Sequence, residues 1–340
     1  MPFKGTLSYA LFALISSFDL VAARQTWDLG NGFELDENNR LAISHNGETI
    51  WASLPNRQFL SASAGVDEFI ENSGAFKINE VDEDKCQGQN ITAISHQQEC
   101  DSVTGEAVTV EGYLNGCGHS TAKYAVSFWV PAEYPNRVAF NVDVDSDYLT
   151  KVYLSFESDS SEDIYGLGAQ ASFASLKNQS VPIFSREQGV GRGDQPITEI
   201  KDAISFFSGG NHFTTYTSIP QFVSTAGRVF YLGQEDTAYA NFDFTRADEI
   251  TVRYDTLNVG GHFMKADNML DGITMLTEYT GRMPQLPEWV DEGAILGIQG
   301  GQEKVNGIVE RGLEADCPIA AVWLQDWYAS SSSSLGSGSR

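Results

Sequence analysis

Two apolar segments near the end of the 340-residue sequence are each followed by polar side chains that could bind a ligand. Residues 293–298 and 319–324 are short and continuously apolar; Gln299 follows the first segment, and Gln325 and Asp326 follow the second. An amide both donates and accepts hydrogen bonds, and a carboxylate can accept two, so this set suits a polar ligand. A simple polar turn at each strand end is the alternative interpretation.

The residues around these positions predict a unit of strand, helix and parallel strand. Continuous apolar runs are typical of strands buried on both faces of a parallel sheet. Pro318 cannot continue a helix, so the helix must end before the second strand. Ligands bind at the carboxyl ends of such strands, where loops leave and helix N-termini point. Four apolar residues share one face of the intervening helix: Val305, Ile308, Val309 and Leu313.

A glycine-rich loop is the second candidate site. Gly189 and Gly191 permit sharp backbone turns, and the charged residues Glu187 and Arg192 flank them. Such a loop could reach from one domain toward a neighbouring pocket, although a solvated turn would have the same sequence. It does not predict phosphate binding, because it lacks the strand-to-helix context and the Gly-Lys-Ser/Thr that a phosphate-binding loop requires.

Two separate blocks of this sequence resemble glycoside hydrolase family 31, the α-glucosidase family, and most closely its sulfoquinovosidase-like branch. LPEW at 286–289, GAILGIQGG at 293–301 and AAVWLQDW at 320–327 are similar to the opening of the family's catalytic barrel. The block 164–193, from IYGLG to GVGRG, resembles the N-terminal domain of the same branch. Over residues 24–327 the resemblance implies an antiparallel, galactose-mutarotase-like β-sandwich followed by the first β-α-β unit of a (β/α)8 TIM barrel.

The same resemblance implies a retaining exo-acting α-glycosidase, which hydrolyses O-glycosyl bonds with two carboxylates about 5 Å apart. In the family both are Asp residues, on the fourth and sixth barrel strands, whereas a whole barrel needs about 250 residues and this sequence reaches only the second strand. We therefore expect a truncated chain that lacks the catalytic Asp pair and is inactive by itself. The resemblance also assigns five residues to the sugar pocket: Gln299, Gln325, Asp326, Glu187 and Arg192.

One departure from the family motif and two open alternatives remain. Ala169 stands where the family's YGLG motif is usually followed by Glu, which removes an acidic contact. The sequence does not separate an α-glucoside from a sulfoquinovoside. A non-catalytic, secreted carbohydrate-binding β-sandwich protein is the rival function, and such a module would have no use for residues 286–327.

The composition narrows the partners and the chemistry. A formal net charge of −25, from 21 basic and 46 acidic residues, argues against nucleic acid, because binding it depends on basic side chains that neutralise phosphates. A carbohydrate fits better. No Cys/His spacing indicates a metal, and nothing indicates a cofactor. Serine hydrolase chemistry is not supported, because no GxSxG motif is present and none of the five histidines suggests a triad.

The N-terminal segment predicts secretion. Lys4 precedes an apolar run from Leu7 to Val21, and small residues follow, so residues 1–23 read as a signal peptide. No later run reaches about 18 apolar residues, so no membrane span is predicted. In the secretory route Asn90 and Asn178 would be glycosylation acceptors.

The four cysteines are consistent with an oxidising compartment. Cys86, Cys100 and Cys117 lie close together in the sequence, so we expect one disulfide among them, but the sequence does not choose the pair. Cys317 stands apart, just before the second strand of the barrel-like segment. We expect it to be a buried free thiol rather than a nucleophile.

Short strands separated by turn residues predict an antiparallel sandwich over residues 24–285. A helix with Asn268 as its N-cap should follow, with Leu270, Ile273, Leu276 and Tyr279 near one face, and Gly281 and Pro284 should stop it. Residues 286–327 form the barrel-like segment, and the Ser/Gly-rich tail 328–340 should be disordered. The predicted strands include 33–35, 40–44, 48–52, 125–130, 137–144, 151–156, 229–232 and 250–254.

Overall fold

The computed structural model describes residues 27–28, 33–35, 40–45, 47–100, 103–118, 120–131, 133–233 and 238–324. The chain divides into two compact units, Met1–Thr280 and Gly281–Arg340, and each is described here by itself. The predicted signal peptide and the Ser/Gly tail lie outside the described residues, as do Gln325 and Asp326.

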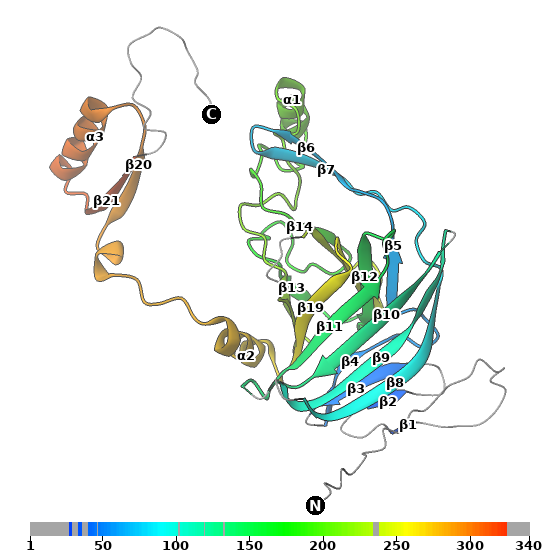
Figure 1. The fold of residues 1–340 in the computed structure, drawn as a ribbon. Helices are drawn as coiled ribbons and strands as arrows, with labels where there is room; N and C mark the ends of the chain where they lie inside the picture. The colour runs from blue at the N-terminus through cyan, green and yellow to red at the C-terminus, as the bar shows by residue number, and fades with distance from the viewer. Residues whose placement is uncertain are drawn as a thin grey trace, which may run out of the picture. The chain divides into compact units, whose positions relative to one another are not determined.

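The first unit is a sandwich built mainly from two antiparallel sheets (Figure 1). The eight-stranded sheet has the order β13 (Ile164–Gly166), β15 (Gln221–Ser224), β16 (Arg228–Leu232), β19 (Asn258–Lys265), β11 (Val138–Asp145), β10 (Ser120–Trp129), β9 (Val103–Cys117) and β8 (Gly88–Cys100). The five-stranded sheet has the order β14 (Ser180–Ile183), β17 (Ala240–Asp243), β18 (Glu249–Tyr254), β12 (Lys151–Glu157) and β5 (Leu60–Ser63). A smaller sheet contains β1 (Trp27–Asp28), β2 (Phe33–Leu35), β3 (Leu41–His45) and β4 (Glu48–Ala52).

Alternating side chains of these strands fill a single large core. In β10, buried residues alternate with more exposed ones, as expected where one face of an antiparallel sheet packs on the core. Phe230 of β16 lies near the middle of the aromatic part of the core and is fully buried. The predicted antiparallel sandwich is therefore confirmed. The predicted strand segments coincide with observed strands, fall within longer ones or differ from them by a residue or two at their ends.

Among the residues that the structure describes, two helices accompany the sandwich, and one of them was predicted. Helix α2 (Met269–Thr280) begins where expected, because the Asn268 Oδ1 atom accepts hydrogen bonds from the backbone N–H groups of Leu270 and Asp271, at 3.0 and 3.1 Å. Its packing face differs from the prediction. Leu270 and Ile273 are exposed, whereas Leu276 is buried with Val229 and Met264. Helix α1 (Ile197–Ile204) is only eight residues long, has no side-chain cap and gave no clear signal.

A disulfide joins Cys86 to Cys117 inside the core of the sandwich, and thus selects one of the pairs that the sequence left open. The side chain of Cys100 lies outside the described residues. Cys317 is a free cysteine, but it is exposed, so the expectation of a buried thiol was wrong. It sits in the turn before β21, where no second layer of structure in its own unit covers it.

Removing this disulfide is expected to destabilise the sandwich strongly. The two cysteines are 31 residues apart, and opening a loop of that size should lower the free energy of unfolding by about 3–4 kcal/mol through the entropy of the unfolded chain. Urea unfolding of the double variant Cys86→Ser/Cys117→Ser under non-reducing conditions measures the loss. Cys317→Ser is the matched control and should leave the midpoint unchanged, and an unchanged midpoint in the double variant would contradict the expectation.

The second unit contains a parallel strand–helix–strand arrangement, as the sequence predicted. Strand β20 (Ala294–Ile298) pairs in parallel with β21 (Ile319–Leu324), and α3 (Gln302–Glu314) connects them. A short 3-10 helix, η1 (Glu288–Asp291), precedes β20. Burial on both faces of the sheet is not observed, because Trp323 is 63% exposed and Ile298 alone is buried in β20. Two strands and one helix do not supply the layers that would cover both faces.

None of the helices that the structure describes is long and apolar enough to cross a membrane.

Candidate functional site

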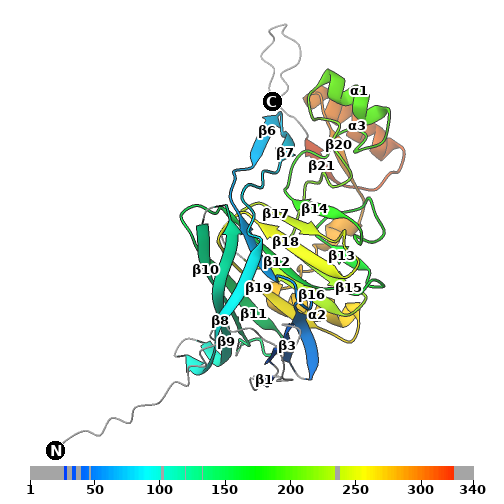
Figure 2. The ribbon, with the colours of Figure 1, turned by 90° about the vertical axis from the view of Figure 1, so that its right-hand side faces the viewer.

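The glycine-rich loop lies in the connection between β14 and β15, next to a β-hairpin that projects from the sandwich. This hairpin consists of β6 (Glu68–Asn72) and β7 (Ala75–Asn79), and Figure 2 shows it at the end of the sandwich where the connection also lies. Glu187 donates its backbone N–H to the Gly74 carbonyl at 3.0 Å. Its exposed carboxylate accepts a hydrogen bond from the Tyr216 hydroxyl at 2.7 Å, and this bond raises the pKa of the Tyr216 phenol.

The two glycines of the loop are required by close backbone packing. Gly189 and Gly191 have positive φ angles of 82° and 94°. A Cβ atom on Gly189 would lie 2.6 Å from backbone atoms of Gly209 and Gly210, and one on Gly191 would lie 2.5 Å from the Thr198 hydroxyl oxygen. Both distances are shorter than any ordinary contact. The loop is therefore pressed against the first turn of α1 and the segment that follows α1, which fixes its path.

Arg192 is held by the same packing. Its backbone N–H donates to the Gly209 carbonyl at 2.9 Å, and its Nη2 donates to the His212 carbonyl at 3.3 Å. The buried Nε atom has no hydrogen-bond partner within the described residues. No ion pair between Glu187 and Arg192 appears in the described part of the chain, so each charge is held by a different neighbour. Both charged groups thus remain able to make further polar contacts.

The neighbours that shape this loop could not be recognised from the sequence. Tyr216 and His212 come from a stretch with no motif, and single polar aromatics in a loop carry no spacing signal. Phe173 packs edge-to-face on the His212 ring, with the ring centroids 5.4 Å apart. Ser172 donates a hydrogen bond to the His212 carbonyl at 2.7 Å. Ser172 and Phe173 follow the YGLG motif, and Arg192 lies near the end of the same block. All three contact His212, so both parts of the block 164–193 meet there.

In the second unit, Gln299 occupies the predicted position at the carboxyl end of β20 and is exposed. Gly300 and Gly301 follow it with positive φ angles of 110° and 85°, and Gly301 is the N-cap of α3. The chain thus turns sharply from strand end to helix start, which is the geometry expected where a parallel unit binds a ligand. Gln325 and Asp326, at the end of the partner strand, lie outside the described residues.

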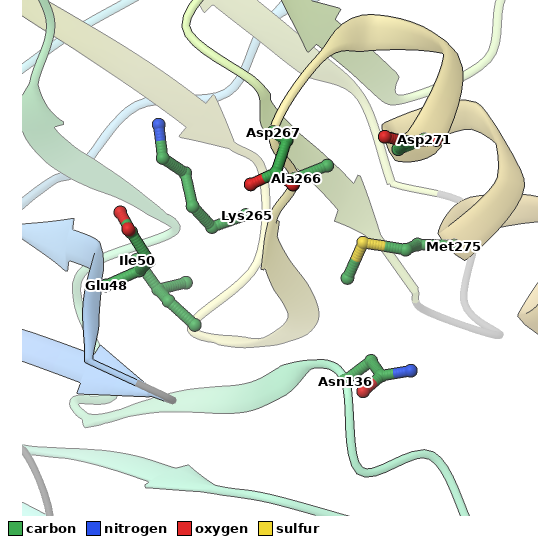
Figure 3. A pocket seen from close by; sticks show the side chains of 8 residues that line it. All are labelled: Glu48, Ile50, Asn136, Lys265, Ala266, Asp267, Asp271 and Met275. Atoms are coloured by element: carbon green, nitrogen blue, oxygen red, sulfur yellow. The ribbon is translucent and has the colours of Figure 1, made fainter.

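A cavity lies elsewhere in the sandwich. It has a volume of about 270 Å³ and is bounded by the end of β19, the start of α2 and β4. Figure 3 shows the carboxylates of Glu48, Asp267 and Asp271 around it, together with Lys265 and Asn136. None of the predicted site residues lines this cavity. Within the described residues no group of three or more His, Cys, Asp or Glu side chains could hold a metal ion.

A cluster of aromatic rings beside this cavity holds a buried arginine. The Arg137 guanidinium lies 3.8 Å from the ring centre of Tyr134 and 3.5 Å from that of Tyr279, which is in the last turn of α2. His262 of β19 stacks on Tyr231, with the ring centroids 6.1 Å apart, and its ring also contacts Tyr279. Burial, and then repulsion from Arg137, lower the pKa of His262 to about 4.

His262 should make the sandwich less stable in mild acid. Its ordinary pKa is 6.5 and its folded-state pKa is about 4, so between these values the unfolded chain binds the extra proton. The stabilising effect of neutral His262 is complete above pH 6.5 and is lost as the pH falls toward 4, by about 1–3 kcal/mol. Urea unfolding at several pH values should show a smaller loss for His262→Phe than for the wild type. Equal losses in the two proteins would contradict this assignment.

Both predicted glycosylation acceptors are exposed. Asn90 lies on β8, where its Oδ1 atom accepts a hydrogen bond from the backbone N–H of Tyr113 at 3.1 Å. Asn178 lies in the turn before β14 with a positive φ angle of 67°. Their positions on the surface are compatible with modification.

Comparison with known proteins gives a consistent set of relatives, although no protein-family model matches the sequence. The sulfoquinovosidase of Escherichia coli K12 is 29% identical over 209 residues, which are 61% of this chain and 30% of that protein. The sulfoquinovosidase of Agrobacterium fabrum is 25% identical over 315 residues, which are 90% of this chain and 41% of that protein. The chain therefore spans less than half the length of these two relatives.

A solved structure agrees with these sequence matches. A sulfoquinovosidase of glycoside hydrolase family 31 from E. rectale, in complex with the aza-sugar inhibitor IFGSQ, has a TM-score of 0.70 and 25% sequence identity. The match covers 86% of this chain and 40% of the other. Similarity over this much of the chain must include most of the sandwich.

Proposed function

Because this chain is a sulfoquinovosidase-like member of glycoside hydrolase family 31, we propose that it serves in the hydrolysis of O-glycosyl bonds of α-glycosides, as part of a retaining exo-acting enzyme. The observation that carries the proposal is the structural match to a family 31 sulfoquinovosidase over 86% of this chain. The rival, a non-catalytic carbohydrate-binding sandwich, gains no support, since the relatives reported above are hydrolases by name. The second unit, in this proposal, begins the TIM barrel.

In each unit, taken by itself, certain residues are proposed to contact sugar hydroxyls. The loop of the first unit offers Glu187 as a hydrogen-bond acceptor and Arg192 as a donor, and its close backbone packing limits how far either can move. The second unit offers Gln299, and by resemblance Gln325 and Asp326, at the ends of two parallel strands. Amide, carboxylate and guanidinium groups are each suited to hydrogen bonds with sugar hydroxyls.

We further propose that the 340-residue polypeptide by itself does not cleave glycosides. The family resemblance assigns the nucleophile and the acid/base to later barrel strands, and this chain has no such strands among its described residues. Binding without the pair of carboxylates leaves the glycosidic bond intact. Secretion and glycosylation at Asn90 and Asn178 belong to the same proposal, and the exposed positions of the two asparagines support the glycosylation.

Turnover is the direct test. The purified 340-residue protein is incubated with 4-nitrophenyl α-sulfoquinovoside and 4-nitrophenyl α-glucoside, and released nitrophenol is measured against a buffer blank. We expect no release above the blank with either substrate. Release that scales with protein concentration would show that this chain carries its own catalytic carboxylates, and would overturn the proposal that it is inactive. A preference between the substrates would then identify the sugar.

A further inference from the structure

The β6–β7 hairpin depends on other parts of the fold for its position. Its two strands form a sheet of their own, separate from the large sheets of the sandwich. Most side chains of β6 are exposed or half-buried, and only Ala75 of β7 is buried. An isolated two-stranded hairpin is at best marginally stable in water. Contacts at its root and along its sides must therefore hold it.

The tip of the hairpin is bonded to the candidate sugar-binding loop. Glu187 donates its backbone N–H to the Gly74 carbonyl at 3.0 Å, so the first residue of the loop is attached to the hairpin turn. Asn72 donates its side-chain N–H to the Phe206 carbonyl at 2.7 Å, just beyond α1. The loop and the segment after α1 thus share one support, which is the end of the hairpin.

The side of the hairpin packs on the segment that leads into the loop. Phe184 stacks on Phe69 with ring centroids 5.3 Å apart, and it meets Phe76 edge-to-face at 5.0 Å. The buried Arg186 donates from Nη1 to the Phe76 carbonyl at 3.0 Å. A displacement of the hairpin would therefore move the residues immediately before Glu187.

The root of the hairpin is fixed by buried charges. Asp67, just before β6, accepts hydrogen bonds from Lys151 Nζ at 2.7 Å and from Arg253 Nη2 at 2.7 and 2.6 Å. The Asp67 and Lys151 side chains are 0% and 1% exposed, and that of Arg253 is 5% exposed. Lys151 also donates to the Val81 carbonyl at 2.6 Å, and the Val81 N–H donates to Asp67 at 2.9 Å. The segment before β6 and the segment after β7 thus meet at one ionic centre.

Two more carboxylates after β7 join this centre. Glu80 accepts hydrogen bonds from the Tyr239 hydroxyl at 2.6 Å and from the Asn241 side chain at 2.8 Å. Asp82 accepts a hydrogen bond from the Tyr153 hydroxyl. The hairpin-root cluster is defined here as Asp67, Glu80, Asp82, Lys151 and Arg253. Its two cations, Lys151 and Arg253, come from β12 and β18, which are neighbouring strands of the five-stranded sheet. The cluster is therefore attached to the sandwich.

We infer that the hairpin-root cluster is a positioning device, which holds the β6–β7 hairpin and through it the loop with Glu187 and Arg192. The support runs from β12 and β18 to Asp67, along the hairpin to Gly74, and across one backbone hydrogen bond to Glu187. Buried ionic bonds are strong and directional because little water competes for them. The sandwich thereby fixes a loop that lies beyond its own edge.

Hydrogen–deuterium exchange of Asp67→Asn tests this inference. The substitution keeps the size of the side chain and removes the charge that binds Lys151 and Arg253. Amides of residues 68–80 and 184–212 should exchange at least tenfold faster than in the wild type, while β11 and β19 change less than twofold. Glu162→Gln is the matched control, because Glu162 is equally buried and pairs with Arg228 at 3.1 Å away from the hairpin. It should leave 184–212 unchanged.

Glu80→Gln provides a second variant in case Asp67→Asn does not fold, because the Glu80 side chain is 36% exposed. It should accelerate exchange in the same two segments by at least threefold. Unchanged exchange at 184–212 in every folded variant would overturn the inference, as would faster exchange spread evenly over the sandwich. The importance of this device for sugar binding rests on the proposed function. Faster loop exchange with undiminished sugar affinity would refute the loop's proposed role but leave the positioning intact.

Discussion

Replacing Asp67 by alanine is expected to lower the free energy of unfolding by about 3–5 kcal/mol, because it leaves two buried cations without their shared carboxylate. Lys151 and Arg253 are 1% and 5% exposed, so water cannot readily take the place of Asp67. Urea unfolding followed by circular dichroism measures the loss. Asp163→Ala is the control, since Asp163 is exposed and its variant should stay within about 0.5 kcal/mol of the wild type. Equal midpoints for the two variants would contradict the account of the cluster.

The stability lost in Asp67→Ala should depend on pH. Burial alone would raise the pKa of Asp67, but hydrogen bonds from Arg253 and Lys151 outweigh it and lower the pKa to about 2. The contribution of Asp67 to stability is therefore complete above its ordinary pKa of 3.8 and is lost as the pH falls toward 2. Burial raises the pKa of the neighbouring Asp255 to about 7, so its ionisation opposes folding as the pH rises from 3.8 to 7. The difference between wild type and Asp67→Ala should shrink at the acid end.

Replacing Phe230 by alanine should also cost about 3–5 kcal/mol, because it opens a cavity at the centre of the aromatic core. Phe230 is fully buried, and its ring lies 5.1 Å from Phe263 and 5.6 Å from both Phe222 and Phe242, measured between centroids. These rings come from both large sheets, so the cavity would weaken the contact between the layers. The measurement is again equilibrium unfolding in urea.

An exposed phenylalanine of the same unit supplies the control for this substitution. Phe206 is 73% exposed, and Phe206→Ala should change the stability by no more than about 0.5 kcal/mol. A loss below about 1 kcal/mol in Phe230→Ala would mean that the two sheets do not pack as the structure has them.

The sequence predicted the local elements well where side-chain patterns repeat. Alternation in β10 and the Asn268 cap of α2 depend on neighbouring residues, and both were recognised. Helix α1 was missed because it is short and has no cap, and because its apolar residues Ile197, Ile200 and Ile204 are exposed instead of packing on a core. Its buried Thr198 packs against Gly191 and Gly209, and this contact leaves no periodic pattern in the sequence.

Contacts between residues far apart in the sequence were the main feature that could not be predicted. Asp67 and Lys151 are 84 residues apart, and each alone reads as an ordinary surface charge. Tyr216 reaches Glu187 across 29 residues for the same reason. The motif at 187–192 did indicate where the chain would turn sharply, because glycine spacing reflects backbone geometry directly. The way in which the β6–β7 hairpin holds that loop depends on the fold of the whole sandwich.

Calorimetric titration with a glycoside tests the central proposal, that this chain contributes sugar-binding residues to an α-glycosidase. The 340-residue protein is titrated with methyl α-sulfoquinovoside and methyl α-glucoside, with the β-anomers as controls. The account predicts saturable binding of at least one α-anomer, weakened at least fivefold by Glu187→Gln and unchanged by Glu199→Gln, an exposed acidic residue of α1. Absence of saturable binding to either α-anomer, or equal effects of the two variants, would contradict it.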